Sequence, residues 1–158
     1  MSAKADVVAS LTVRSATARG VEALAQLAGQ LGYPSSSEQI DRRLAEILGH
    51  PEHAVFVAEI PAGGKEPRIA GWVHAAVART VESDPSVEIC GLVVEESLRS
   101  CGVGERLLVE AEHWARGRGL TTITVRSNVI RERAHAFYQR LGYQVVKSQR
   151  VFRKEIEI

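Results

Sequence analysis

Residues 93–104 read VVEESLRSCGVG, and residues 105–115 continue as ERLLVEAEHWA. An apolar strand thus runs into an Arg-x-x-Gly-x-Gly loop, which opens a helix with an apolar stripe. The start of a helix offers unpaired backbone N–H groups and the positive end of the helix dipole, so it attracts anions. Gly102 and Gly104 let the backbone approach a phosphate closely, and Arg99 adds a positive charge. The pattern predicts a binding site for a pyrophosphate.

Two other phosphate-binding loops share the order of strand, glycine-rich loop and helix. The loop of nucleoside triphosphatases needs Gly-Lys-Ser or Gly-Lys-Thr after four intervening residues, and the dinucleotide-binding loop needs Gly-x-Gly-x-x-Gly in the first βα turn. Neither pattern is present in this sequence.

A second motif follows downstream, where Ser127-Asn128 stands ahead of AHAFYQRLGY at residues 134–143. Together the two motifs resemble those of the GNAT superfamily of N-acetyltransferases. In that superfamily the acetyl-CoA loop reads Gln/Arg-x-x-Gly-x-Gly/Ala, and an Asn after a strand precedes a helix that carries Phe-Tyr before a closing Gly-Tyr or Gly-Phe. Both motifs occur here in the family's order and spacing, as in its small bacterial members.

The resemblance implies a mixed α/β fold of three layers, with a twisted, mostly antiparallel sheet of about seven strands, a splayed strand pair and about four helices. The implied order is β-α-α-β-β-β-α-β-α-β-β, and residue patterns agree with it. They predict a flexible hairpin loop at 61–68, helices at 20–31, 36–48, 105–115 and 131–141, and strands at 10–14, 54–60, 69–77, 87–94, 121–126, 144–147 and 150–154.

Composition favours one compact domain spanning 1–158, because the 158 residues are 45% hydrophobic and 25% charged. The net charge of +1, without a basic run interleaved with aromatics, argues against nucleic-acid binding. Cys90 and Cys101 have no metal-ligand spacing, and no secretory signal or long apolar span stands before them. We expect a cytoplasmic protein with no metal and no membrane contact.

The resemblance implies transfer of an acetyl group from acetyl-CoA to a primary amine by direct attack in a ternary complex. An amine with a pKa of about 10.4 is protonated at neutral pH, so a base must take its proton. Glu88, eleven residues before Arg99, holds the position of the base in the superfamily's histone-modifying branch. Strand alternation predicts one face shared by Glu88, Cys90, Leu92 and Val94. Alternatively Glu88 is a solvated or strand-pairing charge, and a chain of waters deprotonates the amine.

The departing thiolate needs a proton donor, and the resemblance assigns this role to Tyr138. A phenol has a pKa of about 10 and is protonated at neutral pH. Tyr138 also falls on the apolar stripe of its helix, where it could be a core residue. Asn128 would hydrogen-bond the pantetheine arm, cap the helix, or do both. Cys101 is not expected to be a nucleophile, because the family transfers the acetyl group directly.

The cofactor that the resemblance implies is acetyl-CoA. The strand ending at Val94 should splay from the strand starting near Thr121, which would leave its backbone groups to the pantetheine arm. The implied binding residues come from that strand, the glycine loop and the second motif: Leu92, Val93, Val94, Arg99, Ser100, Cys101, Gly102, Val103, Gly104, Glu105, Asn128 and Tyr138.

The acceptor site is expected between the first two helices, their connecting loop at 30–39 and nearby strand ends. Glu38 and Asp41 could recognise a cationic amine or serve only as first-turn helix residues. The Leu-Gly-Tyr-Pro segment at 31–34 is similar to that of family members acting on small amines, including aminoglycosides. His74 could equally be a core or surface residue. The candidate acceptor residues are Tyr33, Trp72, His74 and Glu88.

Three functions remain open at this stage. The first is an acetyltransferase for the primary amine of a small molecule, the second an acetyltransferase for a protein N-terminus or lysine, and the third a non-catalytic acyl-CoA-binding sensor. The presence of both Glu88 and Tyr138 weakens the third function. A homodimer is expected.

Overall fold

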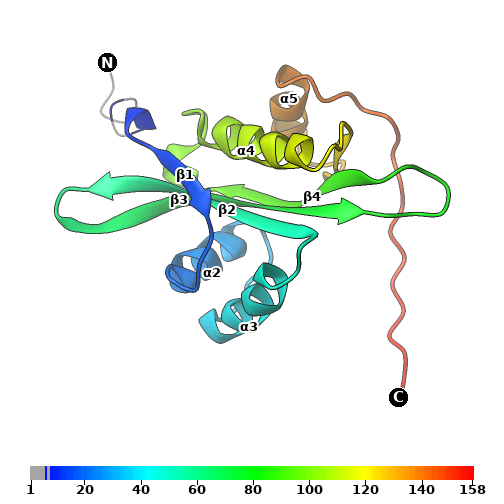
Figure 1. Cartoon of the computed structure of the whole chain (residues 1–158), viewed down its shortest axis with the longest axis horizontal. Coiled ribbons are helices and arrows are strands. Elements are labelled where there is room, and N and C mark those ends of the chain that lie inside the picture. Colours follow the sequence, from blue (N-terminus) through cyan, green and yellow to red (C-terminus); the bar gives the residue numbers. More distant parts are fainter. Residues whose placement is uncertain (1–5, 7) are drawn as a thin grey trace. The chain divides into compact units, whose positions relative to one another are not determined.

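The chain forms two compact units, Met1–Val125 and Arg126–Ile158, in a computed structural model that describes residue 6 and residues 8–158. A five-stranded sheet forms the centre of the first unit (Figure 1). Strands β1 to β4 are antiparallel neighbours, and β5 joins β4 in parallel. The strands lie in chain order: β1 (Thr12–Ser15), β2 (His53–Ala62), β3 (Lys65–Ala78), β4 (Ser86–Val94) and β5 (Ile123–Val125).

Helices cover both faces of this sheet, so the first unit has three layers (Figure 1). Helices α2 (Val21–Gln30) and α3 (Ser37–Leu48) lie on one face, and α4 (Val103–Gly117) lies on the other. Between the sheet and the first pair, Leu24 and Leu44 form a buried cluster with Val55 and Val57. On the other face, α4 buries Leu107, Leu108 and Ala111 completely. The predicted mixed, three-layer α/β class is confirmed.

The start of α3 is fixed by a capping box between Ser36 and Gln39. Ser36 Oγ accepts a hydrogen bond from the Gln39 N–H at 3.2 Å, and Gln39 Oε1 accepts one from the Ser36 N–H at 3.0 Å. These reciprocal bonds satisfy two donors that the first helical turn cannot pair internally. They set where the loop after α2 ends and α3 begins.

The hairpin between β2 and β3 is tighter than the flexible loop predicted for residues 61–68. The strands run to Ala62 and resume at Lys65, so only Gly63 and Gly64 make the turn. Their φ angles of 53° and 85° suit a two-residue turn whose twist matches that of paired strands. The prediction was wrong because the prolines at the strand ends look like loop residues, although the glycine pair by itself closes the hairpin.

The second unit contains α5 (Glu132–Arg140) followed by an extended segment. The two strands predicted at 144–147 and 150–154 are not formed, so the described sheet has five strands instead of about seven. Val151 and Phe152 are each 88% exposed. An apolar, β-branched pattern makes a strand only where another strand pairs with it, and nothing in a single strand's sequence guarantees that partner.

No helix among the described residues is long and apolar enough to cross a membrane.

Candidate functional site

The glycine loop joins two buried anchors and turns sharply between them. Leu98 is 5% exposed and Val103, the first residue of α4, is 1% exposed. Ser100 and Gly102 both have positive φ, 64° and 87°, so the chain passes twice through the left-handed region within three residues. A side chain at position 102 would be strained by that backbone conformation. Gly104 lies inside α4 without a positive φ, so the backbone conformation requires a glycine at position 102 but not at position 104.

The loop presents the N-terminus of α4 as an anion-binding surface. The Arg106 N–H donates to the Gly102 carbonyl at 3.2 Å and is the first bond of the helix ladder. The N–H groups of residues 103–105 precede that bond and therefore have no partner within the helix. They are aligned with the positive end of a 15-residue helix. This geometry fits the pyrophosphate predicted for residues 99–105.

Strand β4 loses one of its two neighbours halfway along. It pairs with β5 only through Val87–Ile123, Glu88–Thr124 and Ile89–Val125. Among the described residues, β4 from Gly91 to Val94 is paired on the β3 side alone. The backbone groups that face away from β3 there remain available for a ligand, as the predicted splay of these strands requires.

Because β4 contains a bulge, the predicted face shared by Glu88, Cys90, Leu92 and Val94 is not formed. The register with β3 passes from His74–Gly91 to Ala75–Ile89, so Cys90 is an extra residue on β4. Glu88 therefore lies opposite Ala76, whereas Leu92 lies opposite Val73. Directly paired residues share a face, and residues 73 and 76 of β3 point to opposite faces. Glu88 and Leu92 thus do not share a face, because the inserted residue reverses the alternation that the sequence predicts.

Trp72 packs under the helices on the same face as Glu88. It contacts the buried cluster that α2 and α3 form with the sheet. Its six-membered ring covers Gly91, where an added Cβ would lie 2.9 Å from a ring carbon. The indole Nε1 is buried and has no hydrogen-bond partner among the described residues. Trp72 is therefore mostly a core residue, with one buried polar atom that has no partner among the described residues.

His74 lies on this same face and bonds to a second histidine. His53 Nδ1 and His74 Nε2 are 2.9 Å apart, so one ring donates a hydrogen bond to the other. The two rings stack with centroids 5.2 Å apart. Burial, and then the charge of His53, lowers the pKa of His74 from 6.5 to about 4. His74 is neutral at pH 7, and the pairing with His53 is a feature that sequence spacing does not indicate.

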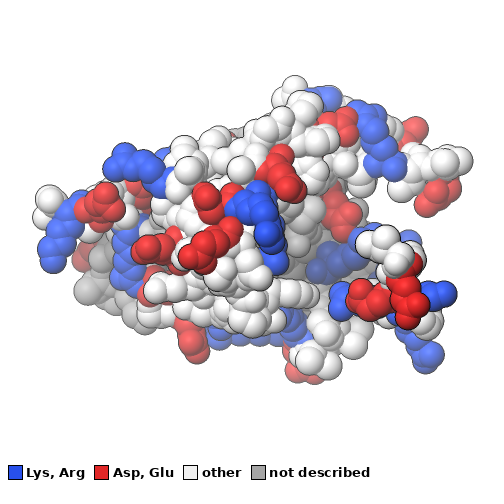
Figure 2. Space-filling view, turned by 90° about the horizontal axis from the view of Figure 1, so that it is seen from below, with Lys and Arg blue, Asp and Glu red and all other residues white. Residues whose placement is uncertain are grey.

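An acidic cavity of about 710 Å³ lies among α2, the start of α3 and the start of β3. The predicted Glu38 and Asp41 line it, whereas Tyr33 is 70% exposed and lies outside its lining, as do Trp72, His74 and Glu88. Figure 2 shows acidic side chains gathered on the face that α2 and α3 cover. The charged lining consists of Glu22, Glu38, Asp41, Glu66, Glu95 and Arg68.

Sequence reasoning missed three of these carboxylates, those of Glu22, Glu66 and Glu95. They come from a helix start, the β2–β3 hairpin and the end of β4, which are far apart in the chain. Each alone looks like an ordinary surface charge. Only the packing of α2 across the sheet brings them to one cavity.

The second unit holds the remaining predicted residues. Burial raises the pKa of Tyr138, against a smaller opposing effect of the Arg131 charge, so its phenol is protonated at pH 7. Asn128 does not cap α5. Its Oδ1 accepts a hydrogen bond from the Ile130 N–H at 3.2 Å, and the N-cap position belongs to Arg131, which makes no side-chain cap bond. The local turn of Asn128 competes with capping because a short amide bonds readily to its own backbone.

No group of three or more His, Cys, Asp or Glu side chains in the described part of the chain could hold a metal ion.

Comparisons with known proteins point to one family. The family model described as "Acetyltransferase (GNAT) family" matches residues 21–143, which lie in both units. Acetyl transferase GW6a of Oryza sativa subsp. japonica is 34% identical over 102 residues, covering 58% of this chain and 24% of that protein. Aminoglycoside N(6')-acetyltransferase type 1 of Klebsiella aerogenes is 36% identical over 106 residues, covering 65% of this chain and 67% of that protein. The chain thus spans about a quarter of the rice protein and two thirds of the bacterial one.

Solved structures share the fold. The structure of AAC(6')-Iy in complex with the bisubstrate analogue CoA-S-monomethyl-acetylneamine has a TM-score of 0.78 and 21% identity, covering 92% of this chain and 99% of that one. Aminoglycoside 6'-N-acetyltransferase AAC(6')-IG of Acinetobacter haemolyticus has a TM-score of 0.76 and 19% identity, with the same coverage.

The lowered pKa of His74 predicts that the protein loses stability in mild acid. An unfolded histidine with a pKa of 6.5 binds a proton more readily than folded His74, so the stabilisation present above pH 6.5 is lost as the pH falls toward 4. Urea unfolding should show a loss of roughly 2 kcal/mol from this group between pH 7 and pH 4.5, at about 1.4 kcal/mol per pKa unit. His74→Gln should remove that part of the slope, and the exposed His113→Gln should not. Equal slopes in wild type and His74→Gln would contradict the assignment.

Proposed function

Because this chain belongs to the acetyltransferase (GNAT) family and is an acetyl-CoA-dependent N-acetyltransferase, we propose that its acceptor is a small molecule carrying several protonated amines. The acidic cavity carries this proposal. Five carboxylates line it in a chain whose net charge is only +1. Arg68 pairs with Glu95 and Arg19 with Glu66, which leaves three lining carboxylates, those of Glu22, Glu38 and Asp41, without an ion pair among the described residues. Such a local excess of negative charge attracts cations and excludes anions. The Klebsiella relative is named for aminoglycosides, which are molecules of this class.

The proposed cofactor site consists of the free edge of β4 and the loop that follows. The backbone of Leu92, Val93 and Val94 would pair with the pantetheine arm, since β5 no longer occupies that side. The loop from Arg99 to Glu105, including Ser100, Cys101, Gly102, Val103 and Gly104, would bind the pyrophosphate through its N–H groups and the Arg99 charge. When bound, acetyl-CoA supplies the acetyl group as an activated thioester.

We treat residues 1–158 as one domain on the basis of the family match. The matched family region runs from residue 21 to residue 143 and crosses the boundary between the units. Asn128 would bond the pantetheine arm while keeping its local turn, because its side chain has donors left beyond the bond from Ile130.

Glu88 is the proposed base for the acceptor amine. It lies on the face of Trp72 and His74, just before the point where β4 and β5 separate. A carboxylate there can take the proton that the ammonium must lose before attack. His74 is the weaker candidate, because its Nε2 is already hydrogen-bonded to His53 Nδ1 at 2.9 Å. Tyr33, Trp72 and His74 would bound the acceptor without accepting its proton.

The distance between Glu88 and the cavity limits the shape of the acceptor. Glu95 is the cavity residue next to the end of β4, seven residues beyond Glu88, or roughly 20 Å along an extended strand. An acceptor that reaches both must carry its charges along its length. We therefore expect extended polyamines and aminoglycosides to outperform compact monoamines.

Tyr138 is the proposed acid for the departing thiolate. Burial keeps its phenol protonated at neutral pH, so the hydroxyl can donate a proton as negative charge develops on sulfur. Its ring packs edge-on against Phe137 and Tyr143, with centroids 5.2 and 5.9 Å away. These contacts restrict the ring without using the hydroxyl.

We also propose that the chain works as a homodimer in the cytoplasm. Six apolar side chains between Val145 and Ile158 are each at least 71% exposed, and polar and apolar residues alternate from Glu155 to Ile158. A second copy that paired with this segment would bury them. Cys90 and Cys101 form no disulfide in the described chain, which suits a reducing compartment.

Analytical ultracentrifugation tests the dimer. The wild-type protein should sediment as a dimer, and Phe152→Ser should shift the equilibrium toward the monomer, because it removes an exposed apolar side chain from the segment that would be buried. A wild-type protein that stays monomeric at high concentration would contradict the proposal.

The acceptor class is tested by measuring thiol release from acetyl-CoA with purified protein. The panel should contain linear polyamines of increasing length, an aminoglycoside, compact monoamines and short peptides with free N-termini or lysines. We expect kcat/KM to rise with the number and spread of amines, and Glu38→Gln with Asp41→Asn to weaken only the polycations. A preference for peptides would support protein acetylation, and no turnover with any amine would support a non-catalytic acyl-CoA sensor.

The acid and base assignments predict different defects in two conservative variants. Tyr138→Phe should keep the ring packing and coenzyme A affinity yet lower kcat about a hundredfold, the usual effect of losing a positioned acid. Glu88→Gln should lower kcat/KM about a hundredfold throughout the active pH range, because an amide cannot take the proton that the ammonium must lose.

Each assignment has its own contradicting outcome. Full activity in Tyr138→Phe would remove the tyrosine from the mechanism. A kcat/KM close to that of the wild type in Glu88→Gln would instead favour deprotonation through a chain of waters.

A further inference from the structure

The segment Glu95–Leu98 connects the proposed pantetheine strand to the proposed pyrophosphate loop. It consists of the residue after β4 and the single turn η1 (Glu96–Leu98). Leu98 is the first of the two buried anchors of the loop, so the place of this segment sets where the loop begins. The contacts that hold Glu95 and Glu96 therefore help to set the position of the loop that would bind the pyrophosphate of the cofactor.

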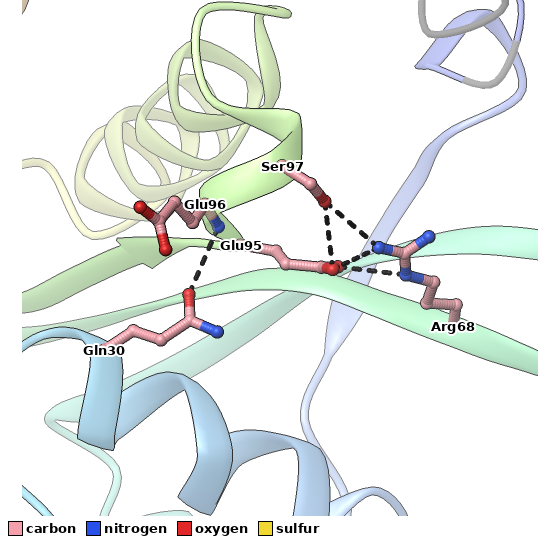
Figure 3. A network of polar contacts seen from close by, with 5 residues as sticks. All are labelled: Gln30, Arg68, Glu95, Glu96 and Ser97. Carbon is pink, nitrogen blue, oxygen red and sulfur yellow. Dashed lines mark hydrogen bonds and ion pairs between the residues drawn. The ribbon is translucent and has the colours of Figure 1, made fainter.

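The guanidinium of Arg68, near the start of β3, forms a bidentate ion pair with the carboxylate of Glu95 (Figure 3). Its Nε donates to Glu95 Oε2 at 2.9 Å, and its Nη2 pairs with the other carboxylate oxygen. Ser97 Oγ donates to Glu95 Oε1 at 3.1 Å and lies 3.4 Å from Arg68 Nη2. A two-point contact between planar groups fixes the orientation of the carboxylate as well as its position.

Gln30 holds the next residue from a different element. Its Oε1 accepts a hydrogen bond from the Glu96 N–H at 3.2 Å (Figure 3). Gln30 is the last residue of α2, so this bond ties the helix to the turn that precedes the loop. The Glu95 N–H also donates to the Ala70 carbonyl of β3 at 2.8 Å. Neighbouring residues are thus held from β3 and from α2.

We propose that Arg68 and Gln30 are positioning residues for coenzyme A, acting through Glu95 and Glu96 on the glycine loop. This inference rests on the proposed cofactor site. Neither residue belongs to that loop, and each would act by restricting the approach of the chain to Leu98 and thereby the direction of the N–H groups at 103–105. Preorganised donors bind an anion more tightly than donors that must first be ordered.

The affinity for coenzyme A, measured by calorimetry without any acceptor, tests this role. Arg68→Gln and Gln30→Leu should each raise Kd about threefold to tenfold, the range expected for losing one or two partly exposed hydrogen bonds. Arg68→Lys should give an intermediate value, since it keeps the charge but not the two-point contact. Gly102→Val, which strains the loop itself, should abolish binding.

Arg79→Gln is the matched control. Arg79 directly follows the last residue of β3, as Arg68 lies near its first, and Arg79 Nε donates to Glu52 at 2.8 Å. The two arginine side chains are comparably exposed, 61% for Arg79 and 49% for Arg68. Arg79→Gln removes a similar ion pair at the other end of the same strand. We expect its Kd for coenzyme A to equal that of the wild type.

Backbone amide exchange in the ligand-free protein gives a second readout. Exchange at residues 99–105 should be faster in Arg68→Gln and Gln30→Leu and unchanged in Arg79→Gln. A purely structural role would alter the melting temperature of all three variants without this localised change.

Two results would overturn the inference. In the first, Arg68→Gln and Gln30→Leu both keep the wild-type Kd for coenzyme A and the wild-type amide exchange at residues 99–105. In the second, Arg79→Gln weakens coenzyme A binding as much as they do. If the wild-type protein binds no coenzyme A, the proposed function fails instead, and the exchange measurement still decides whether Arg68 and Gln30 order the loop.

Discussion

The change of partners along β4 is the constraint on which the other features depend. Up to Ile89 the strand is paired on both sides, and from Gly91 onward it is paired, within the described part of the chain, with β3 alone. Backbone groups are costly to leave unpaired, so a strand edge kept open in this way invites a ligand with its own amide groups. The bulge at Cys90 sits at the transition and decides which side chains face the helices. The loop that follows β4 then turns the chain into the N-terminus of α4, where an anion is favoured.

Close packing on the α2 and α3 face explains several residue identities around this point. Gly91 has no side chain because the Trp72 ring occupies that space. The same burial that packs Trp72 leaves its Nε1 without a partner among the described residues and keeps His74 neutral. Polar groups buried at such a cost usually serve a purpose, and here they surround the point where β4 and β5 separate. Glu88 lies on the same face of the sheet, opposite Ala76.

The charged residues are distributed unevenly over the molecule, so the net charge of the chain does not describe the charge around the cavity. A chain with a net charge of +1 concentrates five carboxylates around one cavity. Arg68 and Glu95 line this cavity and also hold the segment that leads to the glycine loop. Gln30 does the same from α2. The cavity proposed for the acceptor and the loop proposed for the cofactor are therefore built partly from the same side chains.

The sequence by itself determined the features that depend on interactions between residues close together in the chain. The glycine that precedes α4 and the amphipathic stripe of that helix depend on residues within one or two turns, and both were predicted. The Ser36 capping box is equally local. The roles of Glu88 and Tyr138 came from family resemblance and stay predictions. Tertiary structure decided the rest. The Cys90 bulge is set by the register of β3, the His53–His74 bond joins neighbouring strands, and the carboxylates of the cavity come from four separate segments. The apolar runs after Tyr143 form no strands here, because a strand needs a partner that its own sequence cannot supply.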